Sequence, residues 1–167
     1  MIAKTKQRAL LVTLTNETFQ PVRLYYIIPD RSFVTRKLQT LACMVEAPHE
    51  GCWHWLFDAE AASLRFGAGG YDDVPKDRRP IILGRMRFPK AGGMTLQTNS
   101  IERAIAGARF FAPRLGSDVV AMRVRVVNRW FAADEGALDQ LMATLDQDVT
   151  VIDPRQAEAL LQREFQG

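Results

Sequence analysis

The sequence has little of the chemistry that most catalytic and metal sites use. Among its 167 residues there are only two cysteines and two histidines. Two cysteines are too few for the set of disulfide bonds that stabilises a small secreted protein, so we expect two reduced thiols in a cytoplasmic protein. No apolar run is long enough to cross a bilayer, so no membrane partner is expected. The Gly-x-Ser-x-Gly elbow and the Gly-Lys-Ser/Thr phosphate loop are also missing, which argues against the commonest hydrolase and nucleotide-binding enzymes.

The chain contains no linker rich in serine, proline or glycine and no internal repeat. Its length and its hydrophobic share of 47% suit a single globular domain. Charge is distributed unevenly: residues 1–130 hold 20 Lys and Arg against 11 Asp and Glu, whereas residues 131–167 hold 2 against 8. We therefore predict one domain over residues 1–167 with an acidic C-terminal helical segment, 131–167, and an electrostatic partner.

The hydrophobic pattern alternates between strand-like and helix-like segments. Strands are predicted at 9–14, 22–28, 81–88, 94–98, 119–129 and 149–152. Helices are predicted after Asp30, from Asp58 to Phe66, from Asn99 to Pro113, and at 134–146 and 154–165. Hairpins mixed with helices indicate an α+β fold, with an antiparallel or mixed sheet and helices mainly on one face. The result would be a two-layer sandwich, and the stretch 81–152 is long enough to hold a ferredoxin-like unit.

The segment 41–58 has two interpretations. One extends the preceding helix to Ala47, where Pro48 would stop it. The other forms a hairpin that turns at 47–51, and we favour it because proline and glycine suit the turn. The returning strand would then place an aromatic stripe in the core, made of Trp53, Trp55 and Phe57.

Arginines recur at alternate positions of the predicted strands. Because successive side chains of a strand point to opposite faces, Arg85 and Arg87 share a face, and so do Arg123, Arg125 and Arg129. If these strands are neighbours, their polar faces form one guanidinium patch, which a third strand would extend with an aromatic ring. RNA-binding sheets use such surfaces to neutralise and stack single strands. The predicted anion-binding residues are Arg23, Tyr25, Arg85, Arg87, Arg123, Arg125 and Arg129.

All four cysteines and histidines lie between residues 43 and 54. Zinc prefers four such donors in a tetrahedron, but the spacing Cys-x5-His-x2-Cys-x-His fits no zinc motif that we know. In the favoured hairpin, Cys52 and His54 share a face and Cys43 falls on the other. We therefore expect no cofactor, and the alternative is a zinc site drawn from Cys43, His49, Cys52 and His54.

These features favour a non-catalytic binding or adaptor domain whose arginine-rich sheet face meets nucleic acid or an acidic protein surface. The alternative is a scaffold or homo-oligomer that assembles, alone or in a larger complex, through the acidic segment 131–167. A small metal-dependent enzyme with its site around His49, Cys52 and His54 has less support, since no carboxylate is singled out for acid–base work.

Overall fold

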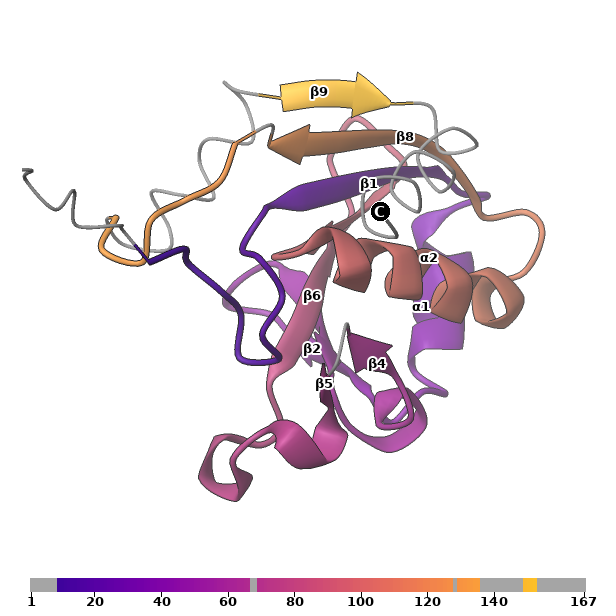
Figure 1. Ribbon diagram of the computed structural model, residues 1–167. Coiled ribbons are helices and arrows are strands. Elements are labelled where there is room, and N and C mark those ends of the chain that lie inside the picture. The colour runs from indigo at the N-terminus through magenta and orange to yellow at the C-terminus, as the bar shows by residue number, and fades with distance from the viewer. Residues whose placement is uncertain (1–8, 67–68, 128, 136–148, 153–167) are drawn as a thin grey trace, which may run out of the picture.

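The computed structural model describes residues 9–66, 69–127, 129–135 and 149–152 (Figure 1). Seven strands form one sheet in the order β2-β3-β6-β7-β1-β8-β9, and every neighbouring pair is antiparallel. The helices α1 and α2 contact each other, and α2 packs on the central strands β7, β1 and β8. The predicted two-layer α+β fold with helices on one face is confirmed.

A ferredoxin-like unit forms the centre of the sheet. Its strands and helices follow the chain as β1 (Val22–Ile27), α1 (Arg31–Leu38), β6 (Ile82–Arg87), β7 (Met94–Thr98), α2 (Ile101–Leu115) and β8 (Val120–Val127). In the sheet these strands lie in the order β8-β1-β7-β6, the arrangement of a split β-α-β pair. The unit therefore needs β1 and α1, and its predicted location within residues 81–152 was wrong.

Between α1 and β6 the chain inserts a hairpin and a small two-stranded sheet. The strands β2 (Met44–Ala47) and β3 (Cys52–Leu56) confirm the hairpin over the helical alternative, and β3 pairs with β6 at the edge of the central unit. The helix predicted from Asp58 to Phe66 was wrong. Only the 3-10 turn η1 (Ala59–Ala61) forms there, and β4 (Arg65–Phe66) then pairs with β5 (Gly69–Gly70). The turns η2 (Tyr71–Asp73) and η3 (Lys76–Arg78) follow.

The core lies between the sheet and α2. Trp55, the central member of the predicted aromatic stripe, is fully buried, with its ring 5.5 Å from that of Phe110 and 5.2 Å from that of Phe111. Trp53 and Phe57 are buried as well, so the stripe belongs to the core as predicted. Because the core takes alternate residues of each strand, the intervening residues project from the opposite face of the sheet.

The ends of the helices show how local chemistry positions them. Asp30 caps α1 by accepting a hydrogen bond from the backbone N–H of Phe33 at 2.7 Å. Helix α2 is capped by Ser100 rather than Asn99, and it continues past Pro113 to Leu115.

Four other predicted segments have different outcomes. The strand predicted at 9–14 was wrong, since only the single bridges Leu10–Ala132 and Val12–Thr18 form there. The strand at 149–152 is confirmed as β9 (Val149–Ile152), which pairs with β8. The helices predicted at 134–146 and 154–165 fall largely or wholly outside the described residues. In the part of the chain that is described, no helix has the length and apolarity needed to span a membrane.

Candidate anion-binding face

The sheet face opposite the helices carries a row of polar side chains that runs across five strands. In register, His54 lies opposite Arg85, Arg85 opposite Gln97, Gln97 opposite Arg23, and Arg23 opposite Arg125. A second row pairs Arg87 with Thr95, Thr95 with Tyr25, and Tyr25 with Arg123. We call this surface the open face, and define it by Arg23, Tyr25, Arg85, Arg87, Thr95, Gln97, Arg123 and Arg125.

The arginine-bearing strands β6 and β8 are not neighbours, because β7 and β1 lie between them. At about 4.8 Å per strand, three spacings separate the two arginine pairs by roughly 14 Å. Arg23 on β1 occupies the space between the two arginine pairs. The Nε and Nη2 of Arg23 donate hydrogen bonds to the side-chain oxygen of Gln97 on β7, at 3.2 and 3.0 Å. The open face is therefore continuous, although its two ends are arginine pairs from distant strands.

Tyr25 lies among three guanidinium groups. The Arg123 Cζ lies 4.4 Å from the centroid of its ring, a cation–π contact. Arg23 Nη1 donates a hydrogen bond to the Tyr25 hydroxyl at 3.4 Å. Burial raises the pKa of Tyr25, but hydrogen bonds from Arg125 and Arg23 outweigh it and bring the pKa below its ordinary value of 10.0. This lowering reflects the positive potential at the centre of the face.

Two hollows on the open face meet at Tyr25 and Thr95. The first, of about 570 Å³, is lined partly by apolar side chains and includes Met122. The second, of about 590 Å³, includes Arg87 and adds Lys90 from the β6–β7 turn. Sequence reasoning missed Lys90, Thr95 and Gln97. For Thr95 and Gln97 the available signal was the alternation of residues 94–98. It places these two side chains on the face of the sheet that Met94 and Leu96, which are buried, do not use.

Neutralisation by the protein's own acids differs among the predicted arginines. Within the described ranges, no carboxylate lies within salt-bridge distance of Arg85, Arg87 or Arg123. Arg129 is different, because it lies beyond the end of β8. Its Nη1 is 3.5 Å from a carboxylate oxygen of Glu135, and its Cζ lies 4.2 Å from the Phe131 ring centroid. Arg129 is therefore partly neutralised by an acidic neighbour, unlike Arg85, Arg87 and Arg123.

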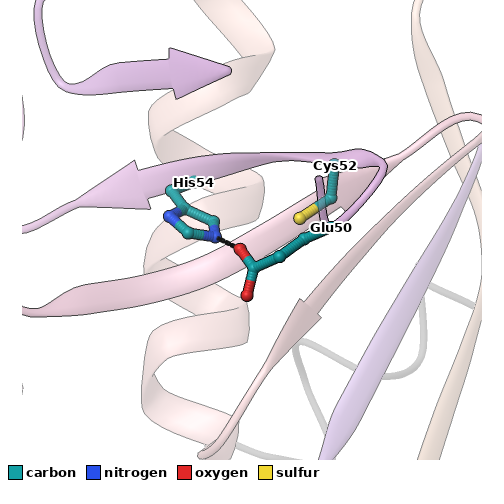
Figure 2. Close-up of side chains that lie close together, drawn as sticks. All are labelled: Glu50, Cys52 and His54. Atoms are coloured by element: carbon teal, nitrogen blue, oxygen red, sulfur yellow. Dashed lines mark hydrogen bonds and ion pairs between the residues drawn. The ribbon is translucent and has the colours of Figure 1, made fainter. Parts of the chain in front are cut away.

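The structure brings two of the four predicted metal ligands together and adds a third residue. Figure 2 shows Cys52 and His54 on β3 with Glu50 from the preceding turn, and the His54 Nε2 meets the Glu50 carboxylate. One ligand atom from each residue lies within 4.8 Å of the other two. Burial raises the pKa of the Cys52 thiol, although the nearby Arg87 opposes this effect.

Cys43 and His49 are not part of this cluster. Cys43 precedes the pair Met44–Trp55 at the far end of the hairpin, whereas Cys52 pairs with Ala47 beside the turn. Three residues at about 3.4 Å each separate these ends by roughly 10 Å. Burial and Glu60 raise the pKa of the Cys43 thiol to about 12. His49 lies exposed in the turn and forms no cluster of potential ligands among the described residues.

A buried ion pair that the sequence did not predict supports the sheet near the start of α2. Arg103 Nε donates to a Glu17 carboxylate oxygen at 2.9 Å, and both side chains are almost wholly buried. Glu17 also accepts hydrogen bonds from Thr13, Thr15 and Ser100. Nothing in the spacing of the sequence identifies Glu17 as the partner of a residue 86 positions away.

Comparison of the chain with protein-family models, curated proteins and solved structures found no match. The function is therefore inferred from the chemistry of the open face and of the cluster beside it.

Proposed function

We propose that the open face binds a single-stranded nucleic acid. The observation that carries this proposal is the position of Tyr25 and its stacked Arg123 where two hollows meet, flanked by arginines from the three strands β1, β6 and β8. Protein surfaces that bind single strands combine positive charge, which follows the backbone, with flat groups on which bases stack. An acidic protein surface would use the charge but would have no need of the stacked pair.

Each part of the face has a distinct role in this proposal. Arg85 and Arg87 at one end contact phosphates through their planar donor forks. Arg123 already covers the Tyr25 ring, so an incoming base stacks on the guanidinium plane or on the edge of the pair. Thr95 and Gln97 supply neutral donors and acceptors for base edges. The span of roughly 14 Å between β6 and β8 suits two or three nucleotides, as on four-stranded RNA-binding sheets.

The test is fluorescence anisotropy with labelled single-stranded RNA and DNA of mixed sequence. Replacing Arg85 and Arg87 together by Gln is expected to weaken binding by tenfold or more, since one charged hydrogen bond is worth about 1.5–3 kcal/mol. The matched control is the double variant Arg36→Gln/Arg78→Gln. It removes the same charge from exposed positions on α1 and η3 and should change affinity by less than about threefold.

A second comparison separates stacking from charge. Tyr25→Leu keeps every charge of the face, and we expect it to weaken binding by roughly five- to tenfold, because the Arg123 guanidinium loses the ring on which it stacks and the base loses the edge of that pair. Polyglutamate used as a competitor tests the acidic-protein alternative. Equal loss of binding in both arginine double variants, or competition by polyglutamate as strong as by RNA, would contradict recognition of nucleic acid by this face. Assembly through the acidic segment 131–167 stays a prediction, because most of that segment lies outside the described residues.

A further inference from the structure

We propose that Glu50, Cys52 and His54 form a zinc-binding site with an open coordination position. They are the one group of three or more potential metal ligands among the described residues whose ligand atoms all lie close together. The three donors are an oxygen, a sulfur and a nitrogen (Figure 2). This site does not depend on nucleic-acid binding by the open face.

The backbone brings the three donors together by simple geometry. Cys52 and His54 are two residues apart on β3, so their side chains leave the same face of the sheet. Glu50 returns to that face because Gly51 has a positive φ of 66°, a conformation in which a side chain would be strained. Two ligands are therefore held by a paired strand, and the third comes from an exposed turn that can adjust.

The distances fit a metal after a small movement. Zinc bonds of about 2.0–2.3 Å place the donors of a tetrahedron roughly 3.3–3.8 Å apart. The donors here lie within 4.8 Å of one another, so a shift of about 1 Å, mainly in Glu50, suffices. Its side chain is 47% exposed, against 18% for His54, and can move without disturbing the core. Zinc would replace the present contact between Glu50 and His54 Nε2.

The donor set selects the class of metal. Mg²⁺ and Ca²⁺ prefer oxygen ligands alone, whereas thiolate with imidazole suits Zn²⁺ and its spectroscopic substitute Co²⁺. On binding, the Cys52 sulfur forms a bond to the metal and its proton passes to the solvent. The thiolate and the Glu50 carboxylate then balance the two positive charges of the ion. This neutrality allows the site to exist beside Arg85, which lies opposite His54 on β6.

Three protein ligands leave the fourth tetrahedral position for water or for an oxygen of a bound anion. Because Cys43 lies at the far end of the hairpin, it cannot supply a fourth sulfur. Cys52 and His54 share the sheet face of Arg85, so a ligand in the fourth position would lie next to the arginine end of the open face.

The experiment is titration of the EDTA-treated full-length protein with Co²⁺, followed by displacement with Zn²⁺. We expect one equivalent of Co²⁺ to produce a thiolate-to-cobalt charge-transfer band and tetrahedral visible bands, and one equivalent of Zn²⁺ to remove them. Cys52→Ala and His54→Ala should abolish the bands, and Glu50→Gln should weaken binding at least tenfold. The matched controls Cys43→Ala and His49→Ala test the other thiol and the other imidazole and should retain both bands. Circular dichroism of every variant checks folding.

Several results would overturn the site. The first is absence of the charge-transfer band at a twofold excess of Co²⁺ over wild-type protein. The second is a band that persists in folded Cys52→Ala or His54→Ala protein. The third is a band that His49→Ala removes as completely as His54→Ala, because the imidazole ligand would then be misassigned.

Discussion

Replacing Glu17 by Gln should destabilise the protein far more than neutralising a carboxylate at the protein surface. Glu17 is 4% exposed and Arg103 is 3% exposed. The substitution keeps the size of the side chain but removes its charge, and so leaves the Arg103 guanidinium buried without its carboxylate. It also turns an acceptor that receives three hydroxyl hydrogen bonds into a group that is half donor.

The expected size follows from the burial of the pair. Removing one partner of a buried ion pair typically costs about 3–5 kcal/mol, because the remaining charge is unpaired. For a chain of this length, a loss of that size lowers the melting temperature by roughly 6–20 °C. The matched control is Glu102→Gln, the same substitution beside Arg103. Burial raises the pKa of Glu102, so its ionised form is disfavoured in the fold, and its removal should change stability by less than about 1 kcal/mol.

The assay is urea unfolding followed by tryptophan fluorescence between pH 3 and pH 7. Burial raises the pKa of Glu17, but the Arg103 cation and the threonine hydroxyls lower it below the ordinary value of 4.5. The unfolded chain therefore takes up a proton at Glu17 more readily than the folded protein does. The stability from this group is complete above the ordinary value and is lost as the pH falls through the lowered one. Wild-type stability should fall more steeply with acid than that of Glu17→Gln.

A loss below 1 kcal/mol at pH 7 would refute this reasoning. So would equal acid sensitivity in Glu17→Gln and the wild type. A double variant, Glu17→Gln/Arg103→Met, provides a third check. It removes the unpaired charge, so the two changes should cost clearly less together than the sum of the single variants, and simple additivity would show that the residues do not interact.

Two further substitutions test the ends and the packing of α2. Ser100→Ala removes the hydroxyl that accepts from the Arg103 backbone at 3.1 Å and should cost about 1–2 kcal/mol in urea unfolding, whereas Asn99→Ala should cost less than half as much. A larger loss of stability with Asn99→Ala than with Ser100→Ala would show that Ser100 is not the residue that caps the helix. Gly107→Ala gains up to about 1 kcal/mol of helix propensity. Its Cβ would nevertheless meet a Leu96 methyl at 2.8 Å and the Trp55 ring at 3.1 Å. Overpacking costs about 1–3 kcal/mol, so thermal unfolding should show net destabilisation, and a stabilised variant would contradict the packing.

Local patterns in the sequence predicted much of the fold, and the failures have physical reasons. Alternation located β1, β6, β7 and β8, and the proline and glycine of the turn decided between hairpin and helix at 41–58. The place of β1 between β7 and β8 depends on pairings between segments far apart in the chain, which no local pattern records. The same limit applies to the sites. Alternation predicted that Cys52 and His54 lie on one face of the sheet. The position of the Glu50 side chain beside them depends on the backbone conformation at Gly51, which alternation does not describe.

The most direct test of the central claim is the salt dependence of single-strand binding. The affinity of the wild type and of Arg85→Gln/Arg87→Gln for one RNA oligonucleotide is measured from low to physiological salt. Each phosphate contact contributes about 0.7 to the slope of log affinity against log salt concentration, so losing two should make the slope shallower by roughly 1.4. The control Arg36→Gln/Arg78→Gln should keep the wild-type slope. Equal slopes in all three proteins, or no salt dependence in the wild type, would contradict a nucleic-acid-binding role for the open face.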